Sequence, residues 1–597
     1  MHRIVAVLLL FSLAIAACDS ERPPVGTENP AVDLTERFDA LLEEYFEHVL
    51  EFSPVFATQI GDGRYNDRYP NSIGPEYRDA VHAYELETLE RLSAIDRQSL
   101  DTERQTSFDV LRYRLETSIA GQRFPDHLAP MNQFRSAATS FVRLGSGSGV
   151  HPFDTVENYE QFLARVDGFV VYVDQAIDNM REGMEAGITQ PRLLMEKFLP
   201  QLDSQLVESA EDSNFYAPVR DMPASFTAAD RKRLAAAYKT AIEDSILPAF
   251  RRLRDFVADE YLGAARESVG YLDLPDGEAW YLHKVRDMTT TDLTPDEIHE
   301  IGLGEIARIH EEMRGVMAAV GFEGELDQFF DYVYSDPGFF FDEREQLINA
   351  YREMLANIQS RVPALFGEYP KTPFEVRPVE EYREKSASKA SYQRGAPDGS
   401  RPGVFYANTY KVGVRPKWDM QSLFLHEAIP GHHFQLSLMQ ENESLPRLRR
   451  FTSFTAFTEG WGLYAEFLGR ELGVYQDPMD LFGTLNAELW RSIRLVSDTG
   501  IHAKGWTRQQ VLDFMHANAA VSETRAIQEA ERFMAYPGQA LAYKTGQLKL
   551  LEIRRNAQRR LGDKFELREF HSEVLGGGAP PLMILEARID RWVEAQL

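Results

Sequence analysis

The stretch FLHEAIPGHHFQ at residues 424–435 is the most informative part of the chain. It places three histidines and a glutamate within eight residues, although the whole chain of 597 residues has only 14 histidines. Imidazole and carboxylate groups are ligands of divalent metals, so the stretch predicts a metal site. The alternative is that these are solvated or hydrogen-bonded side chains at a helix end marked by Pro430 and Gly431.

The spacing departs from the HExxH pattern, in which two histidines one helical turn apart bind a single zinc ion. His426 and Glu427 match the start of that pattern, but Pro430 stands where the second histidine is expected. On a regular helix His432 would point away from His426, whereas His433 would share its face about two turns further on. Proline followed by glycine predicts a kink or bulge here. A bulge would return His432 to the metal, so we favour His432 as the second ligand and keep His433 as the alternative.

A third ligand is expected from the helix predicted over residues 457–472, FTEGWGLYAEFLGREL. The apolar stripe of this helix leaves two carboxylates available, Glu459 near its start and Glu466 near its middle. We favour Glu459. The alternative is that Glu459 is a surface carboxylate at a helix start, where the helix dipole favours negative charge.

Two histidines and one carboxylate are a ligand set of catalytic zinc, which leaves one position open for water. The metal acidifies this water until hydroxide is accessible near neutral pH. Glu427 would take the proton from the water and pass it to the leaving amine, as general base and then general acid. Zinc is inferred from the ligand types, and manganese or cobalt would accept the same set.

A peptide hydrolase also needs a donor for the oxyanion that forms when water attacks the carbonyl. The segment RAIQEAERFMAYPGQALAYKTGQ at residues 525–547 contains the first candidate, Tyr543. Tyr536 and His502 are the next candidates. For each of the three, the alternative is a core aromatic or a hydrogen-bonded polar residue without a catalytic role.

The amino terminus resembles a bacterial lipoprotein signal peptide. Arg3 precedes the apolar run VAVLLLFSLAIA, and small residues lead to Cys18. We expect removal of residues 1–17 and lipidation of Cys18, which would anchor the chain to a membrane, facing the periplasm or cell exterior, without a spanning helix. An ordinary secretory signal is the alternative. Asp19 resembles the inner-membrane retention signal of some enteric bacteria, and the choice of membrane stays open.

The amino-acid composition limits the classes of ligand and partner that the protein can bind. Cys18 is the only cysteine, so no disulfide or thiolate metal ligand is expected after it. Polar and proline-bearing residues 18–32 predict a flexible tether. The formal net charge of −29 argues against nucleic acid as a partner, because phosphate binding needs clustered Lys and Arg. The expected partner is a short peptide, and the sequence leaves the oligomeric state open.

Apolar residues at helical spacing predict a mainly α fold. The capping box from Thr294 to Glu297 marks one helix start. No linker interrupts residues 33–597, which predicts one large helical body of two lobes, 33–290 and 291–597, with a central cleft. The best strand signal is GVFYANTY at residues 403–410, which predicts a small β-element near the metal site. This strand would pair with the substrate backbone or form an ordinary short hairpin.

Several long motifs together resemble the bacterial family catalogued as domain of unknown function 885. They are DGSRPGVFYANT, LHEAIPGHHFQ, TEGWGLYAE, DTGIHAKGWT and YPGQALAYKTGQ, and the similarity is strongest from about residue 395 onward. The family resembles mostly helical zinc peptidases with a long central channel, among them oligopeptidases and dipeptidyl carboxypeptidases. That resemblance implies a zincin-like body with His426, His432 and Glu459 as zinc ligands and Glu427 as the base.

Three functional hypotheses follow. The leading one is a membrane-tethered, zinc-dependent peptidase that hydrolyses short peptides. The second keeps the metal but acts as an amidase on cell-wall peptides. The third is a non-catalytic, lipid-anchored binding protein with a relic site. Exopeptidase or endopeptidase action and the side-chain preference stay open.

Overall fold

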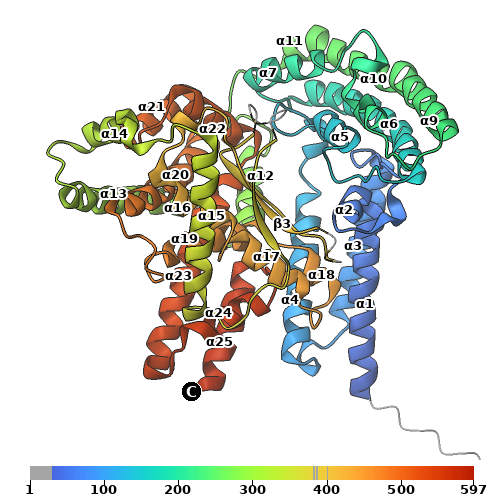
Figure 1. Cartoon of the computed structure of the whole chain (residues 1–597). Coiled ribbons are helices and arrows are strands. Elements are labelled where there is room, and N and C mark those ends of the chain that lie inside the picture. The colour runs from blue at the N-terminus through green and yellow to red at the C-terminus, as the bar shows by residue number, and fades with distance from the viewer. Residues whose placement is uncertain (1–29, 381–383, 385–386, 398, 400) are drawn as a thin grey trace, which may run out of the picture.

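The computed structural model describes residues 30–380, 384, 387–397, 399 and 401–597 (Figure 1). Helices make up 70% of the structure and strands 3%, which confirms the mainly α fold class. The predicted signal peptide, Cys18 and most of the tether lie outside the described residues. The first helix begins at Pro30 and includes the end of the predicted tether. Within these ranges no helix has both the length and the apolar character needed to cross a bilayer.

The helices of the first half bury their apolar faces in two main cores. One is formed mainly by helices α1 to α4, and the other mainly by helices α5 to α11. In Figure 1, α5 to α11 gather at the upper right, above α1, α3 and α4. These helices are α1 (Pro30–Phe52), α2 (Pro54–Gln59), α3 (Pro75–Ser93), α4 (Thr102–Gly121), α5 (Ala137–Gly145), α6 (Val156–Ala186), α7 (Arg192–Asp203), α8 (Ala217–Arg220), α9 (Ala228–Ala241), α10 (Leu247–Phe256), α11 (Leu262–Ala264) and α12 (Gly277–Thr289).

The second half carries the predicted site. Thr294 and Glu297 form the predicted capping box at the start of α13. The helices here are α13 (Pro295–Ala319), α14 (Leu326–Ser335), α15 (Arg344–Arg361), α16 (Met420–Glu427), α17 (His432–Glu441), α18 (Arg447–Phe451), α19 (Thr455–Leu468), α20 (Pro478–Lys504), α21 (Arg508–Asn518), α22 (Glu523–Ala535), α23 (Ala542–Leu561), α24 (Leu567–Gly576) and α25 (Leu582–Gln596).

Buried apolar residues from both halves share cores. Leu194 packs in one core with residues of α13 and α20, and Leu448 of α18 packs in another with α1 and α4. The division into two lobes at residue 290 therefore stays a prediction.

A small mixed sheet supports the metal-site helices. Strand β3 (Gly403–Ala407) lies between β1 (Phe374–Pro378), to which it runs parallel, and β2 (Ala390–Gln393), to which it runs antiparallel. Phe405 of β3 packs against Phe424 of α16, with ring centroids 5.2 Å apart. The predicted pairing of this strand with a substrate backbone is wrong, because both of its edges are already occupied. Among the described strands, β1 and β2 have an edge left for another strand.

Candidate metal centre

The helix is interrupted between α16 and α17, in place of the predicted bulge within one continuous helix. The first helix ends at Glu427, the backbone leaves helical angles at Ala428 and Gly431, and the second helix begins at His432. A Cβ on Gly431 would lie 1.9 Å from the carbonyl oxygen of His426, so this turn requires glycine. The rings of His426 and His432 consequently lie close together in an edge-to-face arrangement, with centroids 4.7 Å apart and an interplanar angle of 79°.

Helix α19 holds this break in place and makes room for the first histidine. Trp461 donates a hydrogen bond from Nε1 to the carbonyl oxygen of Pro430 at 2.8 Å. A Cβ on Gly462 would lie 2.6 Å from the imidazole of His426, so the ring occupies the space that a side chain would take. The motif TEGWG thus serves the site through its tryptophan and glycine as well as its glutamate.

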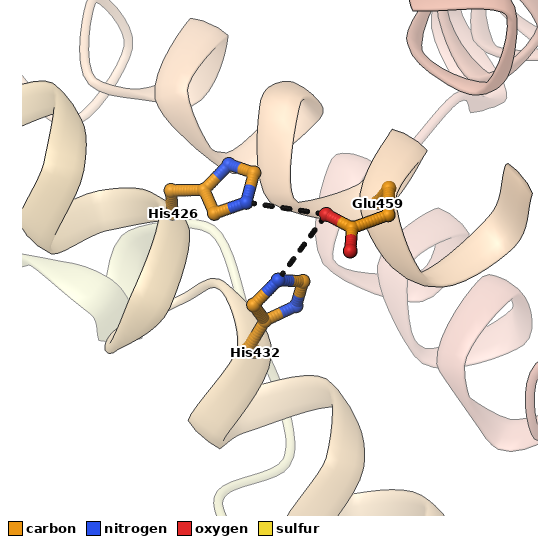
Figure 2. Close-up of side chains that lie close together, drawn as sticks. All are labelled: His426, His432 and Glu459. Carbon is orange, nitrogen blue, oxygen red and sulfur yellow. Dashed lines mark ion pairs between the residues drawn. The ribbon is translucent and has the colours of Figure 1, made fainter. Parts of the chain in front are cut away.

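His426, His432 and Glu459 converge on one point, as Figure 2 shows. The Nε2 atoms of His426 and His432 lie 3.5 and 3.6 Å from Oε2 of Glu459. Three ligand atoms around one tetrahedral zinc would lie roughly 3.3 Å apart. The other ring nitrogen of His432, Nδ1, is buried and has no hydrogen-bond partner among the described residues. These donor types and separations fit a zinc ion.

The alternative ligand, His433, points away from this group. Its Nδ1 lies 2.9 Å from the hydroxyl of Tyr392 on β2, and its ring packs against Phe374 of β1 at 4.6 Å. Burial lowers the pKa of His433 to about 4. Successive residues of a helix point about 100° apart, so the contact of His433 with the sheet directs His432 toward the metal site.

The buried carboxylate of Glu466 orients His426 by binding the ring nitrogen that does not face Glu459. His426 donates from Nδ1 to Oε1 of Glu466 at 2.8 Å, and Ser422 donates to Oε2 of the same carboxylate. The guanidinium of Arg491 lies 3.5 Å from Oε1. Such a contact fixes which ring nitrogen faces a metal. From the sequence, Glu466 is expected only as a possible ligand, although its position seven residues after Glu459 places both on one helix face.

The three groups influence one another electrostatically. Burial opposes a charge on His426, but the carboxylates of Glu459 and Glu466 outweigh it and raise the pKa of His426 to about 9. Burial also opposes charge on Glu459, whereas hydrogen bonds with His426 and His432 hold its pKa well below the usual range. The site therefore favours a positive charge between the carboxylates, which a proton or a metal cation provides.

Glu427, the predicted base, is the last residue of α16 and is half-buried. Its carboxylate makes no hydrogen bond or ion pair within the part of the chain that the structure describes. Glu459 retains 21% of its side-chain exposure, whereas His426 retains 4% and His432 12%. Water therefore reaches the site on the side of Glu459.

The three predicted oxyanion donors differ in their contacts. The oxygen of Tyr543 accepts hydrogen bonds from Arg532 at 3.2 Å and Gln539 at 3.4 Å, and its own hydroxyl hydrogen has no acceptor among the described residues. Tyr536 instead donates to the carbonyl oxygen of Phe134 at 2.8 Å. The buried His502 donates from Nε2 to a carbonyl oxygen at 3.0 Å and packs between tyrosines. Tyr543 alone of the three keeps a hydroxyl hydrogen available.

A cavity of about 1290 Å³ lies between the helices of the first half and the start of α19. Six tyrosines line it: Tyr45, Tyr69, Tyr77, Tyr84, Tyr172 and Tyr536. None of the three predicted ligands lines the cavity. Thr455, which does, stands four residues before Glu459, so the cavity wall and the ligand lie one helical turn apart.

Similarity to known proteins is clear at the level of the family. The family described as "Bacterial protein of unknown function (DUF885)" matches residues 54–589. The chain belongs to this family. The predicted family resemblance is thereby confirmed, while the resemblance to zinc peptidases stays a prediction. No curated protein matches the chain.

Two solved structures resemble this DUF885 chain over most of its length. One is described as a "putative lipoprotein from Colwellia psychrerythraea", with 27% identity, a TM-score of 0.87, and coverage of 94% of this chain and 100% of the other. The second is described as a "putative lipoprotein of unknown function from Shewanella oneidensis", with 19% identity, a TM-score of 0.73, and coverage of 92% and 99%. The second similarity shows the fold alone.

Proposed function

We propose that this protein is a zinc-dependent peptidase that hydrolyses short peptides. The observation that supports this most directly is the convergence of His426, His432 and Glu459, with ligand atoms within 4.8 Å of one another. Three protein ligands around one zinc ion leave the fourth tetrahedral position open for water. A zinc ion bound there would acidify that water and polarise a substrate carbonyl.

The residues around this centre have complementary roles in the proposed reaction. Glu427 is half-buried beside the first ligand and free of partners in the described chain, so its carboxylate is available to accept a proton from water. The same group then protonates the leaving amine. Tyr543 keeps its hydroxyl hydrogen for the oxyanion, and the two donors to its oxygen polarise the O–H bond.

The large cavity is the proposed route and binding space for the substrate. Its tyrosines offer apolar faces and hydroxyl groups, which suit a peptide of mixed side chains. It ends one helical turn before Glu459, on the half of the molecule that carries the metal centre. A cavity of this size favours short peptides over folded proteins.

We further propose that the protein is anchored to a membrane through a lipid on Cys18. The signal-like amino terminus supports this, and both structural neighbours are described as putative lipoproteins. Peptides in the periplasm or outside the cell would then be the available substrates. Cell-wall peptides are among them, so the amidase alternative shares the same site and differs only in the bond cleaved.

The test is elemental analysis of the purified protein, followed by digestion of a peptide library with and without a chelator. We expect about one zinc per chain and cleavage that stops on chelation and returns with zinc. Glu427→Gln should keep the zinc and lose at least about 100-fold in kcat. Exposed Glu443→Gln is the matched control and should behave like the wild type. Zinc-free protein that cleaves no peptide would favour the binding-protein alternative, and equal cleavage by Glu427→Gln would overturn the assignment of Glu427 as the base.

A further inference from the structure

A group of arginines lies beside the metal centre and is not needed to hold a metal. Helix α20 contributes Arg491 and Arg494, three residues apart, and helix α22 contributes Arg525 and Arg532, seven residues apart. These spacings place each pair on one face of its helix. The two helices pack against each other through the core that they share.

This group has fewer counter-charges than its size requires. Glu529 pairs with Arg494 at 2.9 Å and with Arg532 at 3.4 Å. Arg525 lies over the ring of Trp490 at 4.9 Å, and its guanidinium makes no hydrogen bond or ion pair in the part of the chain described here. Arg494 and Arg532 thus share one carboxylate, and the guanidinium of Arg525 has no ion-pair partner among the described residues.

Contacts connect the arginines to the reaction centre. Arg532 donates to the hydroxyl oxygen of Tyr543 at 3.2 Å, and the guanidinium of Arg494 lies 4.8 Å from the centre of the Tyr543 ring. Burial lowers the pKa of Arg532, but the negative groups around it, Glu459 among them, more than offset this. Arg494 and Arg532 therefore lie against Tyr543, the proposed oxyanion donor.

A guanidinium without an ion-pair partner is costly to bury, and a bound anion reduces that cost. The planar fork of a guanidinium matches the two oxygens of a carboxylate. Every unblocked linear peptide carries one carboxylate regardless of its sequence, the one at its carboxyl terminus. A group of arginines beside a peptidase centre is thus suited to recognise that end of the substrate.

We propose that Arg494, Arg525 and Arg532 form a binding site for the terminal carboxylate of the peptide, so that cleavage occurs near the carboxyl end. This inference rests on the proposed peptidase function and adds the class of substrate and the mode of action. Arg525 is the most informative member, because the fold does not use its guanidinium in an ion pair. Arg494 and Arg532 hold Glu529 and shape the site as well.

The test compares two peptides of the same sequence, one with a free terminal carboxylate and one with a terminal amide, on the zinc-loaded full-length protein. We expect the wild type to prefer the free acid by at least tenfold in kcat/KM. Arg525→Gln should remove most of this preference through a higher KM for the acid, and Arg525→Lys should restore part of it. Arg314→Gln, which changes an exposed side chain of α13, is the matched control and should keep the full preference. Equal rates on acid and amide by the wild type, or an unchanged preference in Arg525→Gln, would overturn the proposal.

A binding measurement separates this inference from the peptidase function. Calorimetry on zinc-loaded Glu427→Gln compares the same acid and amide peptides without turnover, and thermal melting checks that each variant is folded. Binding that favours the acid by at least tenfold, and loses this preference when Arg525→Gln is added, supports the carboxylate site even if the wild type cleaves neither peptide. Equal affinity for acid and amide overturns the site even if the protein proves to be a peptidase.

Discussion

The imidazole of His426 lies between two carboxylates of one helix, with Nδ1 2.8 Å from Oε1 of Glu466 and Nε2 3.5 Å from Oε2 of Glu459. Because α19 supplies both carboxylates, seven residues apart, the helix sets the tautomer of the ring and the position of its partner ligand together.

Zinc content should distinguish the ligands from their neighbour. We expect His426→Ala, His432→Ala and Glu459→Ala to lose bound zinc, because each removes one of three protein ligands. His433→Ala should keep it, since His433 contacts the sheet. Elemental analysis after dialysis measures this directly. Loss of zinc from His433→Ala with retention in His432→Ala would reverse the ligand assignment.

The carboxylate behind His426 should tune metal affinity without binding the metal. Glu466→Gln removes the negative charge that makes the imidazole of His426 a stronger ligand, so zinc affinity should fall by about 10- to 100-fold. Competition with a fluorescent chelator gives the dissociation constant, and exposed Glu443→Gln serves as the control. An affinity within twofold of the wild type would show that Glu466 plays no part in positioning His426.

Room for the imidazole depends on the missing side chain at Gly462. In Gly462→Ala the new Cβ would lie 2.6 Å from the ring of His426, which Glu466 holds in place. We expect a loss of about 1–3 kcal/mol in the free energy of unfolding and at least tenfold weaker zinc binding.

The matched control is Gly304→Ala on α13, where a Cβ meets no atom within 4 Å. It should gain about 0.4–1 kcal/mol in the free energy of unfolding, as expected when a glycine in an open helical position becomes alanine. Urea unfolding of both variants makes the comparison, and equal effects of the two would contradict the packing argument.

Tyr543 should act on the reaction and not on the metal. Tyr543→Phe is expected to lower kcat by about 100- to 1000-fold, the usual effect of removing one oxyanion donor, with zinc content unchanged. Steady-state kinetics on a cleaved library peptide measures it, with exposed Tyr332→Phe as the control. A normal kcat would assign the oxyanion to another donor.

His571 should make the folded state sensitive to acid. This buried residue donates from Nδ1 to the carbonyl oxygen of Leu365 at 2.8 Å and accepts at Nε2 from Tyr464 at 2.9 Å, so it must be neutral. Burial lowers its pKa to about 3. The unfolded chain binds this proton below pH 6.5, so the contribution of His571 is complete above pH 6.5 and is lost as pH falls toward about 3.

The measurement is urea unfolding of wild type and His571→Gln at several pH values between 7.5 and 4.5. The slope of stability against pH should be smaller for the variant by up to about 1.4 kcal/mol per pH unit. Exposed His516→Gln is the control. Parallel slopes for wild type and His571→Gln would mean that His571 is already able to take a proton in the folded state.

Much of the fold class was predictable from local patterns. Apolar residues at helical spacing, and the capping box from Thr294 to Glu297, depend on neighbours within two turns. The structure has helices at both predicted places, α13 after Thr294 and α19 in the region 457–472. The strand at residues 403–410 was found but is shorter, ending at Ala407. Its central place in the sheet was not predictable, because β1 and β2 show weak local signals and pair with it only in three dimensions.

The composition of the metal-site motif, with its proline and glycine, by itself determined that the helix is irregular at Pro430 and Gly431 and that several ligand types gather there. Backbone sterics act over a few residues, so such features can be read from a sequence. Only the tertiary structure decided that His432 faces His426 while His433 contacts the sheet, that Glu466 orients the first imidazole, and that arginines of α20 and α22 surround Glu529. These relations join residues tens of positions apart, and the packing of whole helices sets their distances.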